Sequence, residues 1–198
     1  MSWGIIPGTR NRLPLKKRWS GVLQASLGEK YRVIEECLNG MTTQFEDINR
    51  PARNGVEHIQ MILESHSPLD LVMVMLGIND FQDVIGASAK DSAKGLAELI
   101  RKIQNISPEP MSKPAQVLAI IPPEIQKPLG NMANKFSGYE RGKGSETEYL
   151  NALQGYGIHT LEASKFITLS KVDGIHLDET EHLVLGNAVA RKVIEIEK

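Results

Sequence analysis

Asp173 and His176 stand three residues apart in the stretch VDGIHLDETEH, with Gly174 between them. A carboxylate at this spacing, on a turn that contains glycine, can accept a hydrogen bond from the imidazole Nδ1. Such a bond fixes the histidine tautomer and leaves Nε2 free to act as a general base. The structural alternative is a common Asp-Gly turn, followed by Asp178 as the N-cap of the next helix. Both interpretations stay open for this motif taken alone.

Asn79 and Gly40 each follow an apolar run, and each is a candidate for stabilising a negative charge on oxygen. Asn79 lies in GIND, directly after LVMVML, and its side-chain amide can donate to an oxyanion. Gly40 follows YRVIEECLN, and its backbone N–H can donate with no side chain blocking the approach. The structural alternatives are a cap at Asn79 and a turn with positive φ at Gly40.

Strand-like and helix-like segments alternate along the chain, and the candidate residues fall at the ends of the strand-like ones. The predicted strands are 31–38, 69–76, 115–121 and 158–163, and the predicted helices are 54–66, 88–106, 146–157 and one that begins near 178. Residues 123–145 lack periodicity and are predicted to form a loop. This alternation predicts one domain over residues 1–198, with a parallel sheet covered by helices on both faces. Ligands of such sheets bind at the carboxyl ends of the strands.

Composition is that of an ordinary globular domain, with 41% hydrophobic residues and a net charge of −1 from 23 basic and 24 acidic residues. We expect neither a nucleic-acid face nor a membrane anchor, and we interpret the basic run from Arg10 to Arg18 as a solvated loop. Cys37 is the one cysteine, which excludes an intrachain disulfide and a thiolate metal cluster. No Walker loop and no GxGxxG is present, so neither a cofactor nor a metal is expected. The chain has no secretory signal pattern, and we expect a cytoplasmic protein.

Taken together, these clusters resemble the SGNH hydrolases, also called the GDSL esterase family, and within it the bacterial arylesterase and acyltransferase group. The matching stretches span nearly the whole chain: WGIIPGTRNRLPLKKRW, GVLQASLG, YRVIEECLNGMTT, SPLDLVMVMLGIND, VLAIIPP and VDGIHLDETEH. The resemblance implies a three-layer α/β/α flavodoxin-like fold. It also implies that Gly40 and Asn79 are oxyanion donors and that Asp173 and His176 are the acid and base of a catalytic triad. Cys37 stands where relatives have a small glycine.

The family's first motif, Gly-Asp-Ser-x-[Ser/Thr]-x-Gly, raises a question about the nucleophile. Aligning its Trp-Gly continuation with Trp3 and Gly4 puts Met1 directly after the catalytic serine and Ser2 at the Ser/Thr position. We therefore expect the nucleophile and the first strand to lie upstream of Met1, so that the domain is N-terminally incomplete. The favoured explanation is an internal methionine taken as the start. The alternatives are a true pseudoenzyme and a displaced nucleophile at Ser2.

The sequence thus predicts an SGNH-type serine ester hydrolase, or acyltransferase, that acts on small carboxylic esters. The alternative is a catalytically dead binding protein on the same fold. Trp3 is a candidate for lining the acyl pocket, with packing in the core as the other interpretation. His159 and His182 are interpreted as surface residues. The expected partners are a small-molecule ester and further copies of the same chain.

Overall fold

The computed structural model describes residues 1–198, and its centre is a small parallel sheet. The strands are β1 (Leu71–Val74), β2 (Gln116–Ile121) and β3 (His159–Glu162), in the order β1-β2-β3. Val72 aligns with Val117, and Leu118 aligns with His159. Because β2 is covered on both faces, its residues from Val117 to Ile121 are all buried.

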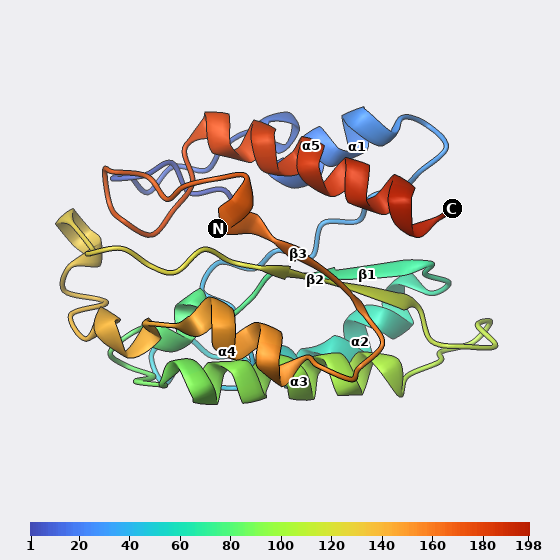
Figure 1. Ribbon diagram of the computed structural model, residues 1–198, viewed down its shortest axis with the longest axis horizontal. Coiled ribbons are helices and arrows are strands. Elements are labelled where there is room, and N and C mark those ends of the chain that lie inside the picture. Colours follow the sequence, from blue (N-terminus) through green and yellow to red (C-terminus); the bar gives the residue numbers. More distant parts are fainter.

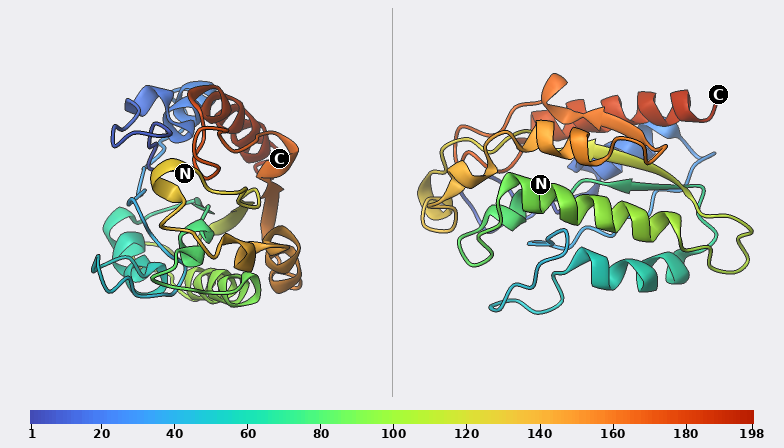
Figure 2. Two further views of the ribbon diagram at one scale, coloured as in Figure 1. Left: turned by 90° about the vertical axis from the view of Figure 1, so that its left-hand side faces the viewer. Right: turned by 60° about the horizontal axis from the view of Figure 1, so that its bottom comes forward.

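Helices cover both faces of this sheet, as predicted (Figure 1). One layer consists of α1 (Trp19–Leu27) and α5 (Glu179–Ile196), which pack against each other. The opposite layer, seen from two further sides in Figure 2, consists of α2 (Gly55–His66), α3 (Ala89–Gln104) and α4 (Ser145–Ala152). The fold is therefore the mixed α/β class that the alternation of segments predicts.

Helix α3 illustrates how the local sequence sets an element. The Ser88 hydroxyl accepts a hydrogen bond from the Asp91 backbone N–H and so caps the first turn. Leu96, Leu99, Ile100 and Ile103 recur at helical spacing and are buried against the sheet layer. Helices α2, α4 and α5 also lie where the sequence predicts them, with ends that differ by one to five residues.

The prediction of a strand at 31–38 is wrong, because this segment pairs with no neighbour in the sheet. The segment is held instead by the Gln24 side chain. The Gln24 amide nitrogen donates to the Tyr31 carbonyl, and its amide oxygen accepts from the Val33 backbone N–H. A β-strand is defined by its hydrogen bonds to a neighbouring strand, and no segment of the structure forms such bonds with residues 31–38. Helix α1 was not predicted from the sequence.

The basic run from Arg10 to Arg18 is not uniformly solvated, which corrects a second expectation. Arg18 is buried and forms an ion pair with Glu35. Arg12 pairs with the same carboxylate, with 2.6 Å between Nη2 and Oε1. These two pairs fix the loop that follows residues 1–4 against the segment around Glu35.

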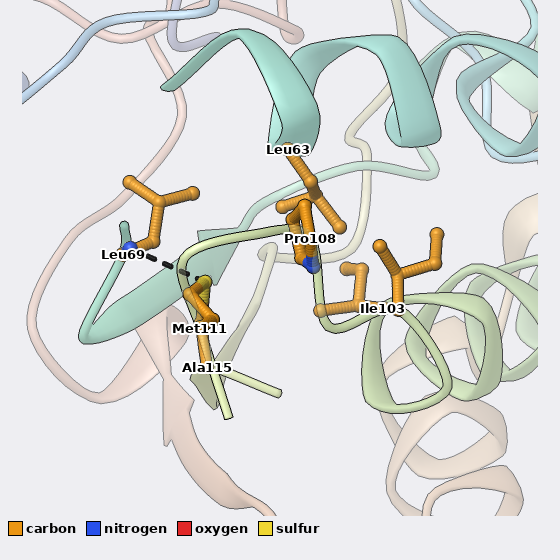
Figure 3. Close-up of a pocket in the computed structure, with 7 residues that line it drawn as sticks. Leu63, Leu69, Ile103, Pro108, Met111 and Ala115 are labelled. Atoms are coloured by element: carbon orange, nitrogen blue, oxygen red, sulfur yellow. Dashed lines mark hydrogen bonds between the residues drawn. The ribbon is translucent and has the colours of Figure 1, made fainter. Parts of the chain in front are cut away.

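A small apolar pocket lies at the amino ends of the strands, under the loop between α3 and β2 (Figure 3). It is lined by Leu63, Leu69, Ile103, Pro108 and Met111 among others, and its volume is about 10 Å³. The Leu69 backbone N–H donates to the Met111 sulfur at 3.5 Å. This space is at the limit for one water molecule, so it is a packing defect of the core. No helix is both long enough and apolar enough to span a bilayer.

Candidate active site

Asp173 and His176 form the contact that their spacing predicts. His176 Nδ1 lies 2.7 Å from Asp173 Oδ2, and Asp173 Oδ1 accepts from the backbone N–H groups of Ile175 and His176 at 3.0 and 2.9 Å. Gly174 makes the turn possible, with a φ of 74°, and a Cβ there would stand 2.6 Å from the Lys127 carbonyl oxygen. The turn thus fixes the carboxylate against one side of the imidazole, and Nε2 has no protein partner.

Near neutral pH, the Asp173 carboxylate is ionised and the His176 imidazole is neutral. Burial acts to raise the pKa of Asp173, but the hydrogen bonds from His176 and Ile175 outweigh it and lower the pKa to about 2. Burial lowers the pKa of His176, and the Asp173 carboxylate opposes this. An ionised Asp173 beside a neutral His176 is the arrangement that a general base requires.

Asn79 lies in the short 3₁₀ helix Ile78–Phe81 that follows β1, and it contacts the loop that contains Gly40. Its amide nitrogen donates to the Met41 carbonyl at 3.0 Å, and its amide oxygen accepts from Gln82 Nε2 at 2.9 Å. The second N–H of the amide has no protein acceptor. Gly40 is buried with a φ of 83°. The structure therefore brings the two predicted oxyanion donors to neighbouring positions.

Asp80, the residue after Asn79, links the 3₁₀ helix Ile78–Phe81 to the loop that contains Gly40. It is fully buried, and it accepts hydrogen bonds from the Thr43 backbone N–H at 2.9 Å, from the Thr43 hydroxyl at 2.7 Å and from the Ser92 hydroxyl at 2.5 Å. Ser92 also lies 2.8 Å from the Tyr149 hydroxyl. Burial raises the pKa of Asp80 to about 6, against the hydrogen bonds that lower it. This carboxylate holds the loop at 40–43 against the 3₁₀ helix.

A second chain of polar contacts runs from Asn79 to a cation. Gln82, which is fully buried, accepts from Arg50 Nη2 at 3.1 Å and donates to Asn79. Arg50 Nε donates to Asp47 at 2.8 Å. The sequence did not predict Asp80 as a structural link, nor Arg50 and Gln82, because the contacts of Asp80 with Thr43 and of Arg50 with Gln82 join residues more than 30 positions apart.

The Met1 amine lies within electrostatic reach of the Asp173–His176 pair. Burial lowers the pKa of this amine, and the Asp173 carboxylate acts to raise it. Trp3 is half-buried under Arg12, whose guanidinium carbon stands 4.7 Å from the ring centroid and whose Nε donates to the Trp3 carbonyl at 2.7 Å. A role for Trp3 in an acyl pocket stays a prediction.

Three other nucleophilic or basic groups, Cys37, His182 and His159, form no hydrogen bond with the Asp173–His176 pair. Burial raises the pKa of the Cys37 thiol to about 11, which keeps it protonated at neutral pH. His182 is fully buried, so its assignment to the surface is wrong. Its Nδ1 accepts from the Trp19 backbone N–H at 3.2 Å, because α5 packs on α1 at this point. His159 is half-buried at the opposite end of the sheet, where Nε2 lies 3.2 Å from Gln116 Oε1.

Metal chemistry has no evident ligand set here, since no three His, Cys, Asp or Glu side chains gather in a geometry that could hold an ion. The groups available for catalysis are a histidine–carboxylate pair and two N–H donors, those of Gly40 and Asn79, that neighbour each other. This combination is suited to deprotonating a hydroxyl group and stabilising the oxyanion that forms when that group attacks a carbonyl.

Comparison with solved structures gives close matches over nearly the whole chain. A carbohydrate acetylesterase from Sinorhizobium meliloti is 32% identical, with 98% of this chain and 94% of that chain covered and a TM-score of 0.92. The inhibitor-bound form of an aryl esterase from M. smegmatis is 30% identical, with the same coverage and a TM-score of 0.91. A second carbohydrate acetylesterase family member from Sinorhizobium meliloti is 28% identical, with coverage of 97% and 92% and a TM-score of 0.90. No family model and no curated protein matches the sequence.

Proposed function

The chain belongs to the SGNH hydrolase family and is an esterase of that type, and from this premise we propose how its residues divide the work. His176 is the general base, Asp173 orients it, and Gly40 and Asn79 stabilise the oxyanion. The observation that carries the proposal is the 2.7 Å contact between Asp173 Oδ2 and His176 Nδ1, with Nε2 left free.

The nucleophile in this proposal is a serine directly before Met1. The family motif aligned on Trp3 and Gly4 puts the serine there, and no Gly-Asp-Ser occurs within residues 1–198. The same position is supported by the electrostatic coupling of Met1 to the proposed base, since the positive Met1 amine acts to lower the pKa of His176. Ser2 is the weaker choice, since no hydrogen bond ties its hydroxyl to His176.

Formation of the acyl-enzyme requires two proton transfers, and both take place at His176 Nε2. His176 Nε2 takes the proton of the serine hydroxyl as its oxygen attacks the ester carbonyl, and it returns that proton to the leaving alcohol. Asp173 stabilises the imidazolium that forms in between. The Gly40 N–H and the free N–H of Asn79 donate to the tetrahedral oxyanion, and each such donor is worth roughly 3 kcal/mol of barrier. Water or a second alcohol then gives its proton to His176 Nε2 as it attacks the acyl-serine carbonyl, and the serine oxygen leaves with that proton, which completes hydrolysis or acyl transfer.

Small carboxylic esters are the proposed substrates. One relative is named as a carbohydrate acetylesterase and another as an aryl esterase, and both names describe the hydrolysis of carboxylic esters. A binding protein without catalysis is the second candidate, and the observation that favours it is the lack of the serine within residues 1–198.

The test compares p-nitrophenyl acetate hydrolysis by the 198-residue chain with that of a chain extended by a strand that ends in Gly-Asp-Ser. We expect trace turnover from the first and robust turnover from the second, and alanine in place of the added serine should cost on the order of 10⁶ in kcat. Asn79→Ala in the extended chain should cost about 10²–10³. An extended chain that stays inactive would favour the binding protein. Strong activity of the 198-residue chain that Ser2→Ala abolishes would assign the role to Ser2.

A further inference from the structure

The Asn79 amide stabilises an oxyanion only when its nitrogen, and not its oxygen, faces the substrate. Asn79 is half-buried, and the two ends of its amide have nearly the same size and shape. If the amide were reversed, the side chain would present an oxygen lone pair to the developing negative charge and repel it. The orientation of this amide therefore matters for catalysis, and other residues have to set it.

Two neighbours of Asn79 select the same orientation. The Met41 carbonyl, which can only accept, lies 3.0 Å from Asn79 Nδ2. Gln82 Nε2, which can only donate, lies 2.9 Å from Asn79 Oδ1. Reversing the amide would oppose two acceptors at Met41 and two donors at Gln82. With one N–H bound to Met41, the other N–H of Nδ2 is left for an oxyanion.

The orientation of Gln82 is itself set by a group that cannot accept. Arg50 Nη2 donates to Gln82 Oε1 at 3.1 Å, and a guanidinium has only donors. Gln82 must therefore turn its oxygen toward Arg50 and its nitrogen toward Asn79. Gln82 is fully buried, so bulk water cannot compensate for a reversed amide. Arg50 in turn is held by Asp47, with 2.8 Å between Nε and Oδ2.

Arg50 also contacts the second proposed oxyanion donor. A Cβ built on Gly40 would stand 2.6 Å from the Arg50 guanidinium carbon, so the guanidinium lies directly against the Gly40 Cα. The Gly40 backbone N–H donates to no group of the protein. One guanidinium thus packs on the donor from the loop and, through Gln82, orients the donor from the 3₁₀ helix.

We propose that Gln82 is a positioning residue for the oxyanion site, and that Arg50 acts through it. Hydrogen bonds donated in one direction, from Arg50 to Gln82 to Asn79, keep the free N–H of Asn79 toward the oxyanion. The inference rests on the proposed function for the role of Asn79, whereas the direction of the hydrogen bonds depends only on contacts within the folded chain. A cationic donor at the start of such a series also polarises each amide in it, which strengthens the last N–H as a donor.

Gln82→Glu tests the direction of the series, because it replaces the donating NH₂ by an oxygen of nearly the same size. The introduced carboxylate still accepts from Arg50, but it cannot donate to Asn79 Oδ1. The Asn79 amide then reverses to donate to the carboxylate, and its oxygen takes the place of its nitrogen. In the extended chain with p-nitrophenyl acetate at about pH 8, we expect kcat to fall by about 10² with KM little changed, because the lost interaction acts in the transition state.

Two comparisons separate positioning from a general structural role. In the Asn79→Ala background, Gln82→Glu should change kcat by less than about threefold, since the residue through which it acts is absent. Gln104→Glu is the matched control. The Gln104 amide nitrogen donates to the Tyr156 carbonyl at 2.8 Å, at the C-terminal end of α3, and its loss should leave kcat unchanged.

Arg50→Met is a second variant, at a side chain that is 26% exposed. It removes the donor that orients Gln82, and it should lower kcat about tenfold, the factor expected for one lost hydrogen bond to a charged group. Full kcat in this variant, or a fall from Gln82→Glu that is equally large with and without Asn79, would overturn the proposal.

Side-chain NMR of the 198-residue chain tests the same hydrogen bonds without catalysis. Gln82→Glu should shift both NH₂ resonances of Asn79, and Gln104→Glu should shift neither. Unshifted Asn79 resonances in Gln82→Glu also overturn the proposal. An active extended chain that Gln82→Glu leaves unchanged keeps the esterase and loses the positioning residue. An inactive extended chain in which the Asn79 resonances still shift keeps the orienting series of hydrogen bonds and loses the esterase.

Discussion

Replacing the buried carboxylate of Asp80 by its neutral isostere should change how the stability of the protein depends on pH. In Asp80→Asn the amide oxygen can still accept from the Thr43 backbone N–H. The new NH₂ group can donate to the hydroxyls of Thr43 and Ser92, which rotate to accept. The substitution therefore removes a titrating charge and keeps the hydrogen bonds, so its effect isolates the ionisation of Asp80.

The magnitude follows from the difference between the folded and unfolded pKa. An unfolded aspartate has a pKa of 3.8, and burial raises the pKa of Asp80 to about 6 in the folded state. A difference of about 2 in pKa corresponds to roughly 3 kcal/mol of unfolding free energy. Because the folded value is the higher one, this stability is fully present below pH 3.8 and is lost as the pH rises through about 6.

The assay is urea unfolding of the protein and of Asp80→Asn at several pH values. Relative to the variant, the unmodified protein should lose about 2 kcal/mol of unfolding free energy between about pH 4.5 and pH 7. Asp83→Asn is the control, because it removes a carboxylate whose pKa is lowered in the folded state instead of raised. Burial acts to raise the pKa of Asp83, but its hydrogen bonds with Ser137 and Gly138 lower it to about 2, so its stability contribution is lost as the pH falls. A free-energy difference between protein and Asp80→Asn that does not vary with pH would refute the reasoning.

Two further predictions concern the core. Gly77→Ala should prevent folding, because φ is 120° there and a Cβ would overlap the buried Tyr149 hydroxyl. Gly144→Ala lies in the left-handed helical region, with a φ of 75° and a ψ of 10° and open space around it, and should cost only about 1 kcal/mol by thermal melting. Comparable melting temperatures for the two variants would contradict the packing at Gly77. Burial lowers the pKa of His182 to about 4, so its ring should stay neutral in NMR titrations until well below pH 6, and its contribution to stability should be present above pH 6.5 and lost as the pH falls toward 4. A titration midpoint near 6.5 would show that the ring is solvated.

The parts of the fold that the sequence predicted are those whose signals are local. The segment 115–121, which is apolar throughout from Val117 onward, predicts the central strand, and the helical spacing of Leu96, Leu99 and Ile103 predicts α3. The segment 31–38 has the same strand-like composition, yet it forms no strand, because a ladder depends on a neighbour that composition does not specify. Tertiary pairing decides between these outcomes.

The candidate site shows the same difference between local contacts, which the sequence predicts, and long-range contacts, which it does not. Asp173 and His176 are three residues apart, so the turn between them makes their contact predictable from the sequence. The contacts of Asp80 with Thr43, and of Arg50 with Gln82, join residues more than 30 positions apart, and only the folded chain reveals them. His182 was misread for the same reason, since its burial depends on the packing of α5 against α1.

The central claim is that a serine directly before Met1 acts with His176, and covalent labelling tests it most directly. The extended chain and the 198-residue chain are treated with a fluorophosphonate, which traps an activated serine, and the modified residue is located by peptide mass spectrometry. We expect a label on the added serine alone, a labelling rate that His176→Ala lowers by several orders of magnitude, and no label on the 198-residue chain. A label on Ser2, or equally fast labelling in His176→Ala, would contradict it.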